Sequence, residues 1–155
     1  MELEDLHVLR AAEALADDIW QEVSAWEKFS QDVVGKQLAH AADSVGANIA
    51  EAYGRYHYGD KLQFLYYARG SLFETKYWIN RALTRKLIKD EKIHDYIQRI
   101  TDIARKLNAF TAIIRKHRSS KNISSLYEKP LIYETVDDSL FTTSELNWLE
   151  YPPGH

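Results

Sequence analysis

The sequence predicts an all-α protein, an antiparallel up-down-up-down four-helix bundle with a C-terminal extension. Proline is absent before Pro130 and glycine occurs only six times in 155 residues, a composition that favours long helices. Apolar residues recur at three- and four-residue spacing in four successive stretches, as in amphipathic helices. Short connections between the stretches make successive helices antiparallel neighbours. We therefore expect a bundle over residues 1–118 and a tail over residues 119–155.

The four helices are expected over residues 5–26, 30–54, 60–83 and 90–118. Ser30, Asp60 and Asp90 are the predicted N-caps, because side-chain oxygens accept hydrogen bonds from the first free amides of a helix. Gln63 follows Asp60 at the spacing of a capping box.

The tail differs in composition from the bundle. A polar, linker-like stretch follows residue 118, and residues 131–155 are acidic but rich in Leu, Ile, Phe, Trp and Tyr. One interpretation is a disordered tail. The other is a tail that docks on its own bundle, a neighbouring subunit or a partner, because disordered segments rarely carry so many large apolar groups. Its acidic charge could also cover the basic stretch described next.

Charge is segregated along the chain. The net charge is −3, yet residues 81–118 hold 11 basic and four acidic residues, a net charge of +7. Such a stretch suits phosphate backbones rather than base sequence, and the alternative is an ordinary solvated face. The candidate nucleic-acid-binding residues are Arg81, Arg85, Lys86, Lys89, Lys92, Arg99, Arg105, Lys106, Arg115, Lys116 and Arg118.

A polar face runs along the second helix, opposite polar residues of the third. If the two helices form a hairpin, Glu51 lies within a turn of Arg69, which predicts an ion pair. Asn48 and Ser71 are expected to add hydrogen bonds. The predicted network comprises Ser44, Asn48, Glu51, Arg55, Arg69, Ser71 and Glu74. It would fix the register of the hairpin, with a ligand contact at residues 55–58 or a subunit contact as alternatives.

Small residues are expected to help this hairpin close. Gly70 and Ala47 would let the second and third helices approach each other closely. Tyr66, Tyr67, Tyr77 and Trp78 do not fit the apolar stripes, and they are predicted either as subunit contacts or as additional core.

Two linked motifs carry a family resemblance. The stretch SVGANIAEAYGR at residues 44–55, followed by FLYYARGSLFE at residues 64–74, resembles the bacterial four-helix-bundle proteins encoded in intervening sequences of 23S ribosomal RNA genes. The resemblance covers residues 3–117. Ala52 stands where that family usually has glycine, and the family rarely has a tail like residues 119–155.

The resemblance implies more than the residues do. It implies a left-handed bundle that assembles into a ring, commonly a pentamer, with a role associated with RNA or other nucleic acid. The fold is also similar to accessory proteins of reverse transcriptases in diversity-generating retroelements, which form basic-surfaced pentameric barrels.

Two Glu-x-x-His pairs are the strongest indication of an enzyme, but the expected helix directions keep them apart. Glu4-x-x-His7 and Glu91-x-x-His94 resemble halves of a di-metal carboxylate site, with Glu51 and Glu74 as the remaining ligands. Both pairs lie at helix N-termini of antiparallel helices, so about 30 Å would separate them. No catalytic, metal-binding or cofactor-binding residue is predicted.

The composition and the start of the sequence indicate the cellular location that we expect. The absence of cysteine excludes disulfides and thiolate zinc sites. The acidic start does not resemble a secretion signal, and no apolar run is long enough for a membrane span, so a cytoplasmic location is expected.

The sequence thus predicts a non-enzymatic, homo-oligomeric scaffold that binds nucleic acid, favouring RNA, through a basic surface. It would serve as accessory to an RNA-processing or reverse-transcribing enzyme. The alternative is a protein–protein adaptor that uses residues 120–155 and binds no nucleic acid.

Overall fold

The computed structural model describes residues 3–122 and 139–151. Every regular element in these two ranges is a helix, which confirms the all-α prediction for them. The last long helix continues to Asn122, four residues into the predicted tail, and the predictions for residues 123–138 and 152–155 lie outside the described part.

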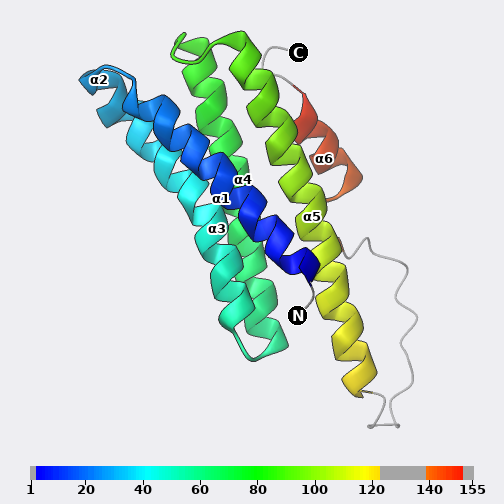
Figure 1. Ribbon diagram of the computed structural model, residues 1–155. Coiled ribbons are helices and arrows are strands. Elements are labelled where there is room, and N and C mark those ends of the chain that lie inside the picture. The colour runs from blue at the N-terminus through cyan, green and yellow to red at the C-terminus, as the bar shows by residue number, and fades with distance from the viewer. Residues whose placement is uncertain (1–2, 123–138, 152–155) are drawn as a thin grey trace.

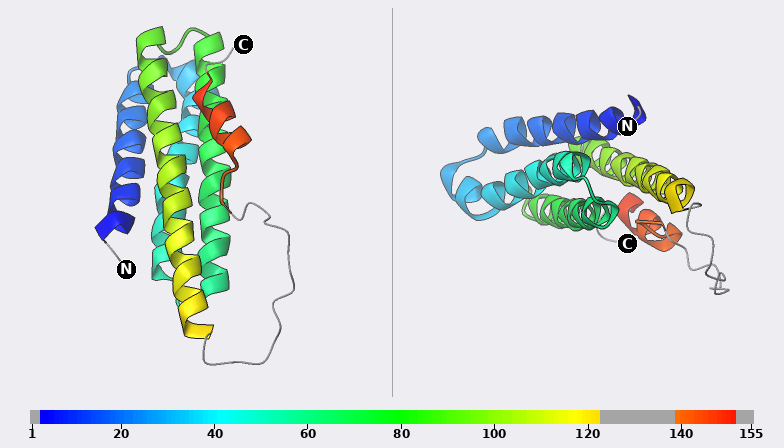
Figure 2. Two further views of the ribbon diagram at one scale, coloured as in Figure 1. Left: turned by 90° about the vertical axis from the view of Figure 1, so that its right-hand side faces the viewer. Right: turned by 90° about the horizontal axis from the view of Figure 1, so that it is seen from below.

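Four long helices form the body of the molecule. They are α1 (Leu3–Ser24), α3 (Lys36–Gly54), α4 (Tyr58–Thr84) and α5 (Asp90–Asn122). Their chain directions alternate (Figure 1), and α1 contacts α3, α3 contacts α4, α4 contacts α5, and α5 returns to α1. Each helix therefore has two long neighbours around one core (Figure 2).

Most of the core comes from the apolar stripes that the periodicity predicted, although Trp20, which has the spacing of the first stripe, is 59% exposed. Ile19, Leu38, Leu65 and Ile100, one from each long helix, are all but fully buried. Tyr96 is also fully buried, yet its hydroxyl finds no hydrogen-bond partner among the described residues.

The second helix begins earlier than predicted. A short helix α2 (Lys28–Ser30) continues into a π-helix, η1 (Gln31–Gly35), and then into α3. Ser30 is therefore inside the helix and is not its N-cap, and Glu27 occupies the cap position without a side-chain hydrogen bond. Gln31 donates instead to the carbonyls of Val23 and Ser24 at the end of α1, at 3.1 and 3.2 Å.

The predicted capping box at Asp60 is wrong. α4 begins at Tyr58 with His57 as N-cap, and His57 makes no side-chain cap bond. Asp60 lies in the first turn, where its carboxylate favours the positive end of the helix dipole.

The sequence did not predict the conformation in which α4 ends. Lys86 has a left-handed φ of 58°. The Lys86 amide donates to the Leu83 carbonyl and the Leu87 amide to the Ala82 carbonyl, both at 2.9 Å. This is the Schellman arrangement, with Lys86 where glycine is usual.

Part of the tail is folded. Residues 139–151 contain α6 (Thr143–Glu150), whose N-terminus has a capping box between Thr142 and Glu145. α6 lies beside α5 in both views of Figure 2, and Leu140, Phe141 and Leu149 are buried. The docking interpretation is therefore confirmed for these residues, and the disordered-tail interpretation is wrong for them.

Candidate nucleic-acid interface and the groove beneath the C-terminal helix

Three exposed cations surround the turn between α4 and α5. Arg85, Lys86 and Lys89 are all exposed, and none of them makes an ion pair with any residue the structure describes. Lys86 and Lys89 belong to the turn itself, since α4 ends at Thr84 and α5 begins at Asp90. We call Arg85, Lys86 and Lys89 the turn cluster. No carboxylate of the described residues neutralises its positive charge.

Other predicted basic residues are neutralised by carboxylates. Arg99 pairs with Asp18 of α1 and with Asp95, the latter at 3.3 Å. The ion pairs with Asp18 and Asp95 offset the desolvation of the Arg99 guanidinium and raise its pKa.

Two more of the predicted basic residues, both on α5, also form ion pairs. Lys106 lies 2.6 Å from Asp102, and Arg105 lies 3.5 Å from Glu150 of α6. Charge on the middle of α5 is therefore largely compensated within the molecule.

The remaining basic residues are spread out. Lys92 lies 5.5 Å from the centre of the Tyr96 ring, and the Arg118 guanidinium lies 4.6 Å from the centre of the Tyr58 ring. Arg81 and Arg115 are half-buried, whereas Lys116 is exposed. From Lys89 to Lys116 the chain advances about 40 Å at 1.5 Å per residue. The eleven predicted residues are therefore spread along the length of the molecule, and the turn cluster is the most concentrated part.

The predicted Glu51–Arg69 ion pair is wrong. Glu51 pairs with Arg55, the residue that follows the end of α3, and Arg55 also lies 4.6 Å from the centre of the Phe64 ring. Arg69 turns away from α3 and pairs with Glu145 of α6. Glu51 thus pairs with a residue four positions away, whereas Arg69 pairs with a residue 76 positions away in the sequence.

The hydrogen bond between Asn48 and Ser71 is confirmed, with the Asn48 amide donating to the Ser71 hydroxyl at 3.4 Å. The same amide donates to the Ser44 carbonyl at 2.8 Å. Glu74 lies outside this network, because it accepts from the Trp78 indole at 3.3 Å. The network is thus smaller than predicted, but it does bridge α3 and α4.

The predicted role of small residues in the α3–α4 contact is also wrong. Gly70 is exposed, and a Cβ there would meet nothing within 4 Å. Ala47 lines a groove between α1 and α3 instead.

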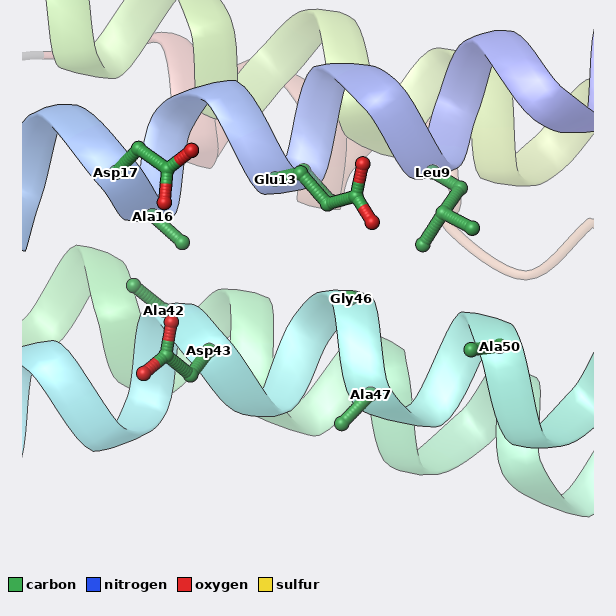
Figure 3. Close-up of a pocket in the computed structure, with 10 residues that line it drawn as sticks. Leu9, Glu13, Ala16, Asp17, Ala42, Asp43, Gly46, Ala47 and Ala50 are labelled. Carbon is green, nitrogen blue, oxygen red and sulfur yellow. The ribbon is translucent and has the colours of Figure 1, made fainter.

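That groove has a volume of about 380 Å³ and a floor made largely of alanine and glycine (Figure 3). Glu13, Asp17 and Asp43 point toward it from its two walls. Nowhere in residues 3–122 and 139–151 do three or more His, Asp or Glu side chains gather closely enough to hold a metal ion. The two Glu-x-x-His segments begin α1 and α5, which start at opposite ends of the molecule (Figure 1).

The predicted interface aromatics divide into two groups. Tyr66 and Tyr77 are about half exposed on α4, and Tyr67 is exposed with its hydroxyl accepting from Gln63 at 2.7 Å. Trp78 is half-buried and packs against the core. Near the α3–α4 turn, Tyr56 is 91% exposed.

The most elaborate polar site holds α6, and we call it the α6 groove: Arg69, Phe73 and Lys76 of α4 with Arg105 and Asn108 of α5. Lys76 is 1% exposed and sits in the apolar stripe between Leu72 and Ile79. Its ammonium donates to the carbonyls of Trp148, Leu149 and Tyr151, at 2.9, 2.6 and 2.6 Å. These are free carbonyls at the C-terminal end of α6, where the helix dipole is negative. Burial lowers the pKa of Lys76 to about 8.

The N-terminal side of α6 is held equally closely. Asn108 donates to the Phe141 carbonyl at 2.8 Å and accepts from the Phe141 amide at 2.7 Å. Arg69 donates to the Leu140 carbonyl at 2.9 Å and pairs with Glu145. The groove therefore binds main-chain atoms on both sides of the helix.

Aromatic rings fill the space between these polar contacts. The Phe73 ring centre lies 5.7 Å from the ring centres of both Phe141 and Trp148. The Arg69 guanidinium lies 5.0 Å from the Phe73 ring centre.

Sequence reasoning missed Lys76 and Asn108 completely. A lysine at an apolar position of a helical stripe was the available signal, because a buried ammonium needs a partner. Asn108 carried no comparable signal.

A family model described as 23S rRNA-intervening sequence protein matches residues 4–109. A search of curated proteins finds no match. None of the helices in the described residues combines the length and the apolar character needed to cross a bilayer.

Proposed function

We propose that this chain, which belongs to the 23S rRNA-intervening sequence protein family, is a non-enzymatic cytoplasmic scaffold that binds RNA through exposed cations. The observation that carries the proposal is the turn cluster. Arg85, Lys86 and Lys89 place three exposed charges, which form no ion pair within residues 3–122 and 139–151, at one end of the molecule. The compensated charges of Arg99, Arg105 and Lys106 make a weaker case for the middle of α5.

Such a cluster would bind phosphates rather than read base edges. Each neutralised phosphate releases condensed counterions, so affinity falls with rising salt. A single subunit offers few contacts, and symmetry would multiply them in an oligomer.

We propose homo-oligomerisation, with the pentamer favoured by the resemblance. The exposed face of α4 supports it. Gly70 costs helix stability by up to about 1 kcal/mol relative to alanine, and the single chain does not use the space it leaves. Tyr66 and Tyr77 flank Gly70 on the same helix face, four and seven residues away. Close approach by a second chain would account for both features, and mass determination in solution tests it.

An accessory role beside an RNA-processing or reverse-transcribing enzyme rests on the resemblance alone. The adaptor alternative loses support, because Leu140, Phe141 and Leu149 of the tail are buried against the chain's own helices.

The test is a pair of double charge reversals measured by RNA binding. Arg85→Glu with Lys89→Glu is expected to weaken binding of a fluorescent RNA oligonucleotide at least ten-fold at low salt. The slope of log Kd against log salt should shrink by about one for each lost phosphate contact. Arg10→Glu with Lys36→Glu changes the net charge equally at exposed sites outside the cluster, and it should have a small effect.

Two results would contradict the proposal. One is the absence of RNA binding by the unmodified protein at low salt. The other is an equal loss in both double variants, which would indicate a general effect of net charge.

A further inference from the structure

The α6 groove places three cations opposite three negative groups of α6. Arg69 pairs with the Glu145 carboxylate, and Arg105 lies 3.5 Å from the Glu150 carboxylate. Lys76 donates to the carbonyl oxygens at the negative end of α6. Taken alone, α4 and α5 therefore present a positively charged track along the face that α6 covers.

An aromatic surface lies within this track. Phe73 contacts both Phe141 and Trp148 of the tail, with ring centres 5.7 Å apart in each case. Cations that follow a backbone, combined with an aromatic ring that stacks on bases, are the features by which proteins bind single-stranded nucleic acid.

We propose that the α6 groove is a second binding site, specific for single-stranded RNA, and that docked α6 closes it by occupying the positions of phosphates and bases. The proposal rests on the RNA-binding function proposed above. It adds a separate site, within α4 and α5 rather than at the turn between them, and it gives the tail a regulatory role.

Several features of α6 favour its reversible release from the groove. α6 has only eight residues, too few for a stable isolated helix in water. Sixteen residues separate Asn122 from Ser139, so a released α6 stays tethered to the bundle. Only Leu140, Phe141 and Leu149 of this segment are among the buried apolar residues, whereas the rest of the core comes from the four long helices together with Val34 of η1 and Ile88 of the α4–α5 turn. Release of α6 would therefore leave the bundle folded.

The experiment uses the full chain and removes two anchors of α6. Phe141→Ala with Leu149→Ala takes away two side chains that are 1% and 0% exposed without altering any residue of the groove. Asn147→Ala, on the exposed side of α6, is the matched control. Amide hydrogen exchange across residues 143–150 reports whether α6 has been released. Glu145→Lys is a second release variant, because it places like charges together at Arg69.

The probe is a fluorescein-labelled 20-nucleotide oligouridylate, titrated at low salt beside the matching DNA strand. Release is expected to tighten RNA binding at least ten-fold, with no change for Asn147→Ala. Adding Arg69→Glu to the released variant should remove that gain. A peptide of residues 139–151 should compete with the RNA for the released protein.

The outcomes separate the two proposals. If the unmodified protein binds the RNA and released variants bind it equally well, the groove is not an RNA site, while the turn-cluster proposal stands. A gain that survives Arg69→Glu also overturns the groove. If neither the unmodified nor the released protein binds RNA, both proposals fail. A larger gain for DNA than for RNA overturns the specificity for RNA.

Discussion

The buried ammonium of Lys76 makes the attachment of α6 depend on pH in an unusual direction. Burial lowers its pKa from 10.5 to about 8 in the folded chain. Release of α6, or global unfolding, exposes the group and returns its pKa to the ordinary value. Between these two pKa values the folded state binds the proton less tightly than the unfolded state. Stability attributable to Lys76 therefore increases as pH rises through this interval and is lost as pH falls through about 8.

The size of the effect follows from the shift. One pKa unit corresponds to about 1.4 kcal/mol, so raising the pH from about 7 to about 9 should add about 1.3 kcal/mol to the free energy of unfolding. Other groups titrate as well. Tyr96 is one of them, because burial, with Glu22 and Asp18, raises its pKa. The informative quantity is therefore the difference between the unmodified protein and Lys76→Met.

The assay is urea unfolding of both proteins across this pH range, with amide exchange of residues 143–150 as a second readout. Lys76→Met should speed that exchange near pH 7, because it removes the donor to three carbonyls. The stability difference between the two proteins should then change by about 1.3 kcal/mol toward the unmodified protein by about pH 9. A difference that stays constant would refute the assignment of a lowered pKa to Lys76.

Three further predictions concern the stability of the bundle. Lys86→Gly should raise the free energy of unfolding by about 1 kcal/mol, since glycine adopts the left-handed φ of 58° without strain, and an unchanged thermal midpoint would contradict this. Gly35→Ala should cost about 1–3 kcal/mol, because a Cβ would lie 2.6 Å from the Val23 Cγ1 atom, and adding Val23→Ala should recover part of the loss if that contact is the cause. Tyr96→Phe should stabilise the protein by about 1 kcal/mol in denaturant titrations, since it removes a buried hydroxyl without a partner among the described residues, and a clear loss of stability would point to an unseen partner.

The periodicity of the sequence predicted the core residues. The predicted ion pair was wrong, because each of its members has another partner, either nearby on the chain or far along it. The apolar stripes placed Leu38, Leu65 and Ile100 in the core. The hairpin register was also close enough to predict the bond between Asn48 and Ser71.

The failures have physical causes. Glu51 found Arg55 one helical turn away, a nearer partner than any residue across the hairpin. Arg69 found Glu145, which is 76 residues away in sequence, and no local pattern encodes such a contact. Lys86 has a left-handed φ at a position where glycine is usual, so the sequence did not indicate how α4 ends.

The hydrogen bonds that Lys76 and Asn108 make with α6 and the residues flanking it all go to backbone atoms. These hydrogen bonds depend on where the short helix begins and ends, whereas its buried side chains Leu140, Phe141 and Leu149 supply the apolar contacts. Exposed α6 positions such as Ser144 and Asn147 can therefore be rewritten without loss of attachment. The segment could carry a label, a charge pattern or a foreign epitope at these exposed positions to a defined place on the bundle, provided that the buried Leu140, Phe141 and Leu149 are kept.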